Sequence, residues 1–130
     1  MRILVDTNVL VSTLLFPKSI PSFALEHIIN HHDLFLCQQN IDELNRVIGK
    51  IAPELLGNIK EYLESLPFRL LQNGPQSNTK LRDETDQLIL DAAIAYHIDI
   101  VVTGDMDFLA IGLTKPECMT ARQYLEKFGR

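Results

Sequence analysis

A chain of 130 residues, 46% of them hydrophobic, is long enough for one ordinary core and needs neither disulfides nor a structural metal to fold. Its two cysteines, Cys37 and Cys118, form no metal-binding or redox motif, which indicates a reducing, cytoplasmic environment. The N-terminus reaches Asp6 too early for a signal peptide, and no apolar run approaches the roughly 20 residues of a membrane helix. We expect a soluble protein with a single domain over residues 1–130.

The net charge of −5 disfavours a general affinity for nucleic acid, because phosphate binding normally needs a basic surface.

The first quarter of the chain alternates short apolar runs with longer amphipathic ones. Residues 2–6 are predicted to form a strand, and residues 8–16 a helix that ends before the next proline. A second helix is predicted over residues 21–32, because Pro21 suits a first helical turn, and a strand follows at residues 34–37.

The second quarter is predicted to be mainly helical. A third helix begins near Asn40 and places Glu43 on the flank of its apolar stripe, whereas Asp42 points to solvent. A fourth helix is predicted over residues 53–66, and a short third strand over residues 68–71.

The segment at residues 72–81 contains an Asn-Gly-Pro turn and a polar tail, which predicts a flexible connection and not a domain boundary. Asp83 can cap the helix that follows and that ends near His97. On this helix Asp86 borders the core, whereas Asp91 is expected on the polar stripe.

The last quarter returns to short elements. We expect a strand at residues 99–103, a helical turn at 106–111, a strand at 117–119 and a helix at 121–128 that opens with a capping box at Thr120. Strands that alternate with helices throughout the chain predict an α/β fold, in which helices flank a central parallel sheet of four to five strands.

Four acidic residues occur where such a sheet would collect them. Asp6 and Asp105 follow two predicted strands, and their side chains meet if those strands are neighbours, because ligand crevices lie beyond the carboxyl ends of parallel strands. The helices that carry Glu43 and Asp86 can close this crevice from its rim. Crowded carboxylates destabilise one another unless a cation offsets their charge. The sequence therefore predicts a site for Mg²⁺ or Mn²⁺, ions that suit hydrolysis of phosphodiesters.

Each acid also has a simpler structural explanation. Asp6 is a suitable helix N-cap, and Asp83 with Asp86 is a suitable capping pair. Glu43 taken alone reads as a solvated side chain, and Asp105 as turn chemistry after a glycine. These separate explanations do not account for the expected position of all four acids at the same edge of one sheet.

Four segments carry a recognisable pattern, namely VDTNVL at residues 5–10, RDETD at 82–86 with two alanines at 92–93, VTGDMDFL at 102–109 and, more weakly, Glu43-Leu44. They resemble the four motifs of the PIN domain ribonucleases, and the resemblance runs over nearly the whole chain. It implies a three-layer α/β/α PIN-like fold. It also implies Mg²⁺ or Mn²⁺ ligands at Asp6, Glu43, Asp86 and Asp105, polar support from Thr7, Asn8 and Thr103, and additional acids at Asp83 and Asp107.

Within that family, the short form resembles VapC-like toxins of toxin–antitoxin modules. This resemblance implies an endoribonuclease that acts on RNA, forms a homodimer and is restrained by a small antitoxin protein. Four basic residues lie near the expected ligands in sequence and are candidate RNA contacts, namely Arg46, Lys50, Lys80 and Arg82.

Three alternatives stay open. A receiver or phosphatase-like domain would use an aspartate as phosphate acceptor, but Asp6 lacks the second Asp of an Asp-x-Asp nucleophile. A catalytically silent RNA-binding or protein-interaction module would gain nothing from this set of acids. His27 and His31 share a helix face at a spacing that zinc ligands use, but a polar helix face explains them better in the absence of an HExxH pattern.

Overall fold

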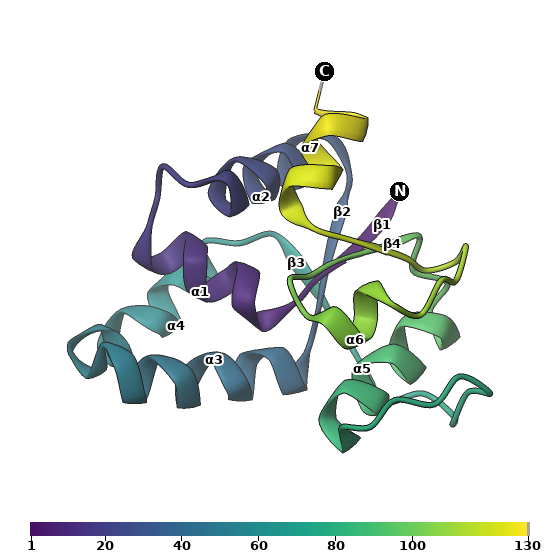
Figure 1. Cartoon of the computed structure of the whole chain (residues 1–130). Coiled ribbons are helices and arrows are strands. Elements are labelled where there is room, and N and C mark those ends of the chain that lie inside the picture. The colour runs from purple at the N-terminus through teal and green to yellow at the C-terminus, as the bar shows by residue number, and fades with distance from the viewer. Residues whose placement is uncertain (130) are drawn as a thin grey trace.

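The computed structural model describes residues 1–129 and contains a five-stranded sheet with helices on both faces (Figure 1). The strands lie in the order β3-β2-β1-β4-β5, and every neighbouring pair is parallel. The prediction of a parallel, three-layer α/β/α fold is therefore confirmed. The strands are β1 (Arg2–Val5), β2 (Asp33–Cys37), β3 (Phe68–Leu71), β4 (Ile100–Val102) and β5 (Glu117–Met119).

The helices fall close to their predicted positions. They are α1 (Thr7–Leu15), α2 (Ile20–His31), α3 (Gln38–Ile51), α4 (Leu56–Glu64), α5 (Glu84–Ala95), α6 (Met106–Leu109) and α7 (Ala121–Phe128). The single helix predicted at residues 53–66 is wrong in one detail, because Pro53–Leu55 form a separate 3-10 turn, η1, before α4 begins. Proline keeps the preceding Ala52 out of the helical region, so the chain restarts with a tight turn.

Each face of the sheet buries its own apolar cluster, because alternate residues of a strand point to opposite sides. Ile3 and Val5 of β1 pack with residues of α1, α2, α3, α4 and α7. Leu4, which lies between them, packs with residues of α5 and α6. Burial on both faces explains why β1, β2 and β4 contain continuous apolar runs.

The centre of the sheet is the point where the strand order reverses. β1 pairs with β2 on one side and with β4 on the other, so its neighbour β4 comes from a distant part of the sequence. Open parallel sheets bind ligands beyond the carboxyl ends of their strands at such a point. Asp6 directly follows β1, and Thr103 directly follows β4. The prediction that these two strands are neighbours is therefore confirmed.

Asp91 holds the loop at residues 72–81 against α5. It lies beside Gln87, as predicted, but the loop covers this part of the polar stripe. Its side chain is 4% exposed, because Ser77 covers it and donates to Asp91 Oδ1 from both its backbone N–H (3.0 Å) and its hydroxyl (2.8 Å). Gln87 donates to the same oxygen at 2.9 Å. The loop approaches so closely that a Cβ on Gly74 would lie 2.7 Å from the Cβ of Ala95.

The histidines of α2 take part in helix packing. His27 Nδ1 and the hydroxyl of the buried Tyr124 are hydrogen-bonded at 2.6 Å, and the His27 and His31 rings lie 4.3 Å apart. His27 thus joins α2 to α7, a contact that the sequence did not predict. Among residues 1–129, the histidines join no cluster of metal-ligating side chains.

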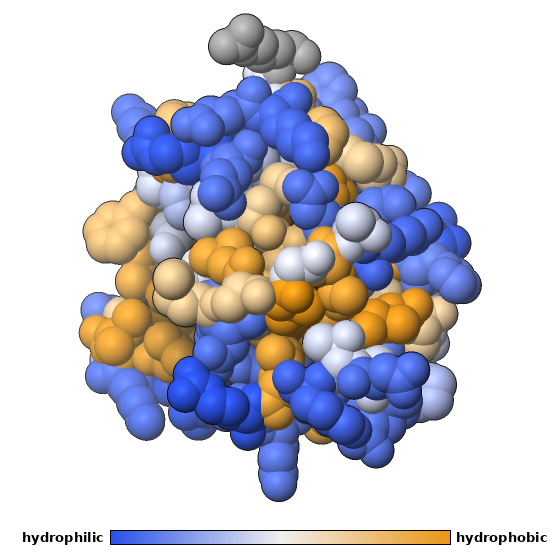
Figure 2. Space-filling view, turned by 45° about the vertical axis from the view of Figure 1, so that its right-hand side comes forward, coloured by the Kyte–Doolittle hydropathy of each residue, from blue (hydrophilic) through white to orange (hydrophobic). Residues whose placement is uncertain are grey.

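The outer surface carries exposed apolar side chains as well as charges. Figure 2 shows apolar residues gathered across the middle of one face, between hydrophilic regions above and below. Large exposed apolar residues of the chain include Phe16, Phe23, Ile51, Leu56 and Met106. Within residues 1–129 no single helix is long and apolar enough to cross a membrane, and α1 with α2 reaches that length only as a pair bent by 108°.

We predict that Asp91→Ala lowers the free energy of unfolding by about 2–3 kcal/mol, because the Ser77 and Gln87 donors lose their buried acceptor. Chemical denaturation monitored by circular dichroism measures this change. Asp42→Ala, which removes an exposed carboxylate, is the matched control and should stay within about 0.5 kcal/mol of wild type. Equal stability of the two variants would contradict the role given to Asp91.

Candidate metal centre

The four carboxylates singled out by the sequence line one cavity of about 320 Å³ beyond the carboxyl ends of β1 and β4. Asp6 comes from the end of β1, Glu43 from the second turn of α3, Asp86 from the first turn of α5, and Asp105 from the turn before α6. Thr7 and Asn8 also line this cavity. Four segments distant in sequence thus bring their acidic side chains to one place.

Asp6 is held rigidly by hydrogen bonds to both of its carboxylate oxygens. Oδ1 accepts from the Thr7 backbone N–H at 2.8 Å and from Asn40 Nδ2 at 3.2 Å, while Oδ2 accepts from the Thr103 hydroxyl at 2.7 Å. Asp6 is only 7% exposed. The capping explanation is also correct, since Asp6 caps α1 through Thr7, but capping leaves one edge of the carboxylate facing the cavity.

Asn40 organises this region, and the sequence reasoning did not identify it as a site residue. Its side chain is fully buried; Oδ1 accepts from the Cys37 backbone N–H at 3.0 Å, and Nδ2 donates to Asp6 Oδ1 and to Thr7 Oγ1, each at 3.2 Å. Thr7 Oγ1 in turn lies 3.3 Å from Glu43 Oε2. The only sign in the sequence was that Asn40 lies in the first turn of a helix after a strand. Asparagines are too common at helix starts for this position to mark a site residue.

Thr103 links Asp6 to Asp105 through its hydroxyl group. Its hydroxyl donates to Asp6 and accepts from the Asp105 backbone N–H at 3.0 Å. Asp105 then caps α6 by accepting from the Asp107 N–H at 2.8 Å. Asn8 supports the same turn, because Gly104 N–H donates to Asn8 Oδ1 at 3.3 Å.

The two additional acids behave differently. Oxygen atoms of Asp86, Asp105 and Asp107 lie within 4.8 Å of one another, so Asp107 belongs to the acidic cluster. Asp83 is an exposed N-cap of α5 that accepts from the Asp86 N–H at 2.9 Å, as the capping explanation expected. It does not line the cavity.

The gathered charges disturb one another. Burial, together with the neighbouring Asp105, Asp83, Asp6 and Glu43, raises the pKa of Asp86 to about 7. Burial also raises the pKa of Asp6, an effect that the Thr103 and Thr7 hydrogen bonds oppose and that Glu43 and Asp105 reinforce. The protein thus holds several carboxylates together at an electrostatic cost.

The residues present fit a hard divalent cation. The cavity offers carboxylate oxygens and no thiolate or imidazole, a set that suits Mg²⁺ or Mn²⁺ better than zinc. A cation among them would offset the repulsion that, together with burial, the larger cause, raises the pKa of Asp86.

All four basic residues expected near RNA are exposed, and two of them contact the acidic cluster. Arg82 Nη2 pairs with Asp107 Oδ1 at 2.7 Å although its side chain is 86% exposed, and Arg46 lies 3.6 Å from Glu43. Lys50 and Lys80 are exposed. The two arginines therefore border the acidic cluster directly.

We predict that the metal-free protein loses stability as the pH rises from about 4 to about 7 through Asp86. An acid whose pKa is raised by folding binds its proton more tightly in the native state, so its contribution is fully present below the unfolded pKa and is lost as the pH passes the folded value. Asp86→Asn should remove this component and be more stable than wild type at pH 8 in EDTA.

Thermal denaturation of both proteins across this pH range measures the difference. Asp42→Asn, a charge change outside the cluster, serves as control. Added Mg²⁺ or Mn²⁺ should stabilise wild type more than Asp86→Asn, because only wild type keeps all the acidic oxygens. Parallel pH profiles of wild type and Asp86→Asn would contradict the electrostatic account.

Comparison with known proteins agrees with this geometry. The family model of the PIN domain matches residues 2–107. No curated protein matches the chain in sequence. The fold is similar to that of VapBC2 from Rickettsia felis in a crystal structure bound to a DNA fragment from its promoter, with a TM-score of 0.68, 16% identity, and coverage of 92% of this chain and 97% of that chain. Since the family match spans most of its length, the chain belongs to the PIN domain family, whose members are generally nucleases.

Proposed function

We propose that this protein is a Mg²⁺- or Mn²⁺-dependent endoribonuclease and the toxin of a toxin–antitoxin pair. The observation that carries the proposal is the convergence of Asp6, Glu43, Asp86 and Asp105 on one cavity beyond β1 and β4. We assign these four residues as metal ligands, directly or through water, and Asp107 as a further acid of the cluster.

A divalent ion bound there would lower the pKa of a water molecule for attack on phosphorus and would offset charge on the phosphate oxygens. The residues of this chain hold the acidic ligands in position for this chemistry. Thr103 and Asn40 hold Asp6 in one orientation, and the Thr103 hydroxyl also fixes the turn that carries Asp105. Glu43 lines the same cavity and lies next to Thr7, whose hydroxyl is 3.3 Å from Glu43 Oε2.

The carboxylates around Asp6 disfavour the phosphate-acceptor alternative. Glu43, Asp86 and Asp105 line the same cavity and would repel a phosphoryl group on Asp6, whereas all four acids together suit a cation. The three hydrogen bonds to Asp6 fix its orientation. We therefore favour Asp6 as a fixed ligand.

The partners in this proposal are RNA, a small antitoxin and a second copy of the chain. Four exposed basic residues are the proposed RNA contacts, namely Arg46, Lys50, Lys80 and Arg82. The similarity to VapBC2 supports a VapB-like antitoxin. The apolar side chains gathered on one face (Figure 2) are a suitable surface for a protein partner. We propose a cytoplasmic location.

We predict that purified wild type cleaves mixed RNA in Mn²⁺ or Mg²⁺, and that Asp6→Asn and Asp105→Asn lower the rate by at least about 100-fold, because each removes a charged ligand. Gel analysis of end-labelled RNA measures this, and EDTA should abolish the wild-type reaction. Equal cleavage by all three proteins would mean that another site or a contaminant acts. The same assay with single-stranded DNA tests whether the protein cleaves RNA in preference to DNA.

We further predict that Thr103→Val weakens Mn²⁺ binding and cleavage by about 10–100-fold, the usual effect of losing a group that orients a ligand. Isothermal titration with Mn²⁺ measures the affinity without relying on activity. Thr13→Val is the matched control, because it removes another buried threonine hydroxyl, one that bonds to Leu10 and Tyr62 away from the cavity. Equal Mn²⁺ affinity of the two variants would contradict the role given to Thr103.

A further inference from the structure

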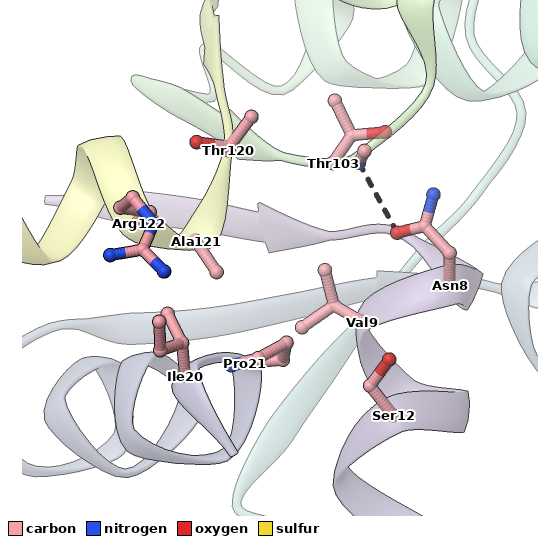
Figure 3. A pocket seen from close by; sticks show the side chains of 10 residues that line it. Asn8, Val9, Ser12, Ile20, Pro21, Thr103, Thr120, Ala121 and Arg122 are labelled. Atoms are coloured by element: carbon pink, nitrogen blue, oxygen red, sulfur yellow. Dashed lines mark hydrogen bonds between the residues drawn. The ribbon is translucent and has the colours of Figure 1, made fainter.

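A second cavity lies beside the acidic one and is the larger of the two, at about 410 Å³ compared with about 320 Å³. It is formed by α1, the start of α2, the turn after β4 and the start of α7 (Figure 3). Its volume falls in the range of about 300–1,000 Å³ that is typical of small-molecule sites.

The two cavities share a wall. Asn8 and Ser12, one turn apart on α1, line both of them. Thr103, whose hydroxyl bonds to Asp6, also lines the second cavity. Figure 3 shows the Asn8 side chain bonded to the turn after β4 at this boundary. A linear molecule that crosses Asn8 would therefore reach from one cavity into the other.

The chemistry of the second cavity is opposite to that of the first. Four carboxylates line the first cavity, whereas the second has no acidic residue in its lining and has one guanidinium, that of Arg122. Arg122 is exposed, and no carboxylate of residues 1–129 lies within ion-pair distance of it. In a chain of net charge −5, Arg122 therefore offers a phosphate a point of attraction beside the acidic centre.

The remaining walls combine apolar and polar groups. Val9, Ile20 and Pro21 form an apolar side, which faces Arg122 across the cavity in Figure 3. Ser12 and Thr120 supply hydroxyl groups at the rim. A nucleotide matches this combination, because its base offers apolar faces, its ribose offers hydroxyls and its phosphate carries charge. The lining contains no aromatic ring, so the base would pack on Ile20 and Pro21 without stacking.

We propose that the second cavity holds the RNA nucleotide next to the cleaved phosphodiester, with its outer phosphate at Arg122. This inference rests on the proposed ribonuclease function and adds the position of the strand. The strand runs over Asn8, with the cleaved bond at the acidic cavity and the neighbouring base and ribose beside α2. Arg122, which the sequence analysis did not include among the RNA contacts, is the residue that binds the backbone there.

The first test compares Arg122→Gln with Arg69→Gln, which removes the same charge from an exposed position on β3, at the opposite edge of the sheet. Fluorescence anisotropy with a labelled single-stranded RNA of mixed sequence, in EDTA, measures binding without cleavage. Arg122→Gln should weaken binding about tenfold, equivalent to about 1.4 kcal/mol. It should also reduce the slope of log affinity against log salt by about 0.7, the value for one phosphate contact on a single strand. Arg69→Gln should change neither quantity.

The second test locates the ligand. NMR titration of the metal-free protein with the four nucleoside 5′-monophosphates should shift the amide signals of Ile20, Ala121 and Arg122 in wild type, and Arg122→Gln should reduce that binding. Shifts confined to the acidic cavity, or equal effects of Arg122→Gln and Arg69→Gln on RNA binding, would overturn the inference.

The failure of this inference and the failure of the proposed function are distinguishable. If wild type cleaves RNA and Arg122→Gln keeps the same KM, the ribonuclease proposal stands and the nucleotide site is wrong. If wild type cleaves no RNA in Mn²⁺, the ribonuclease proposal fails, and the NMR titration alone decides whether the second cavity takes a nucleotide.

Discussion

Mutual repulsion among carboxylates gathered in one cavity is the constraint on which this site depends. The fold brings Asp6, Glu43, Asp86 and Asp105 to one cavity, where burial, reinforced by the charges of the neighbouring acids, raises the pKa of Asp86 to about 7. A sequence under no functional demand would gain stability by replacing one of these acids with a neutral residue. The arrangement is explained if a divalent cation occupies the cavity, because the same oxygens that repel one another then become ligands.

Neutral side chains hold the acids in place. Asn40 and Thr103 bond to the two oxygens of Asp6, and the same Thr103 hydroxyl accepts from the backbone of Asp105. Amides and hydroxyls fix the position of a carboxylate without neutralising it, whereas a buried lysine or arginine would compete with the metal. The cations near the cluster, Arg46 and Arg82, lie on exposed positions at its rim. The charges of the site therefore remain available to an ion and to an incoming phosphate.

Local patterns predicted the elements of this fold well, because apolar period and capping chemistry are local properties. The strand at Phe68–Leu71, the strand at Glu117–Met119 and the last helix with its Thr120–Gln123 capping box fall at their predicted bounds. The two strands that carry Asp6 and Asp105 pair as expected. The resemblance to PIN domains is also confirmed by the family match.

What the sequence did not predict depends on contacts between distant segments. Asp91 lies on the polar side of an isolated α5, and only the return of the loop through Ser77 buries it. Asn40 looks like an ordinary helix-start residue until Asp6 and Thr7 are placed against it. In the sequence, Arg122 is one of several surface cations. Only the structure shows that it lines the cavity between α1, α2 and α7.

The overall acidity of the chain is compatible with a phosphate-bearing substrate when charge is considered locally. Much of the negative charge near the site belongs to the proposed ligands, and the neighbouring cavity has no acid in its lining. A divalent cation in the first cavity and Arg122 at the second would give a strand two points of attraction across Asn8.

The most direct test of the central claim is anomalous diffraction at the manganese edge from crystals of this protein grown with Mn²⁺. The account predicts a strong anomalous peak in the acidic cavity, with oxygen atoms of Asp6 and Asp105 coordinating the ion directly or through water. A map at saturating Mn²⁺ with no peak in that cavity, and with the carboxylates bonded only to protein groups, would contradict it.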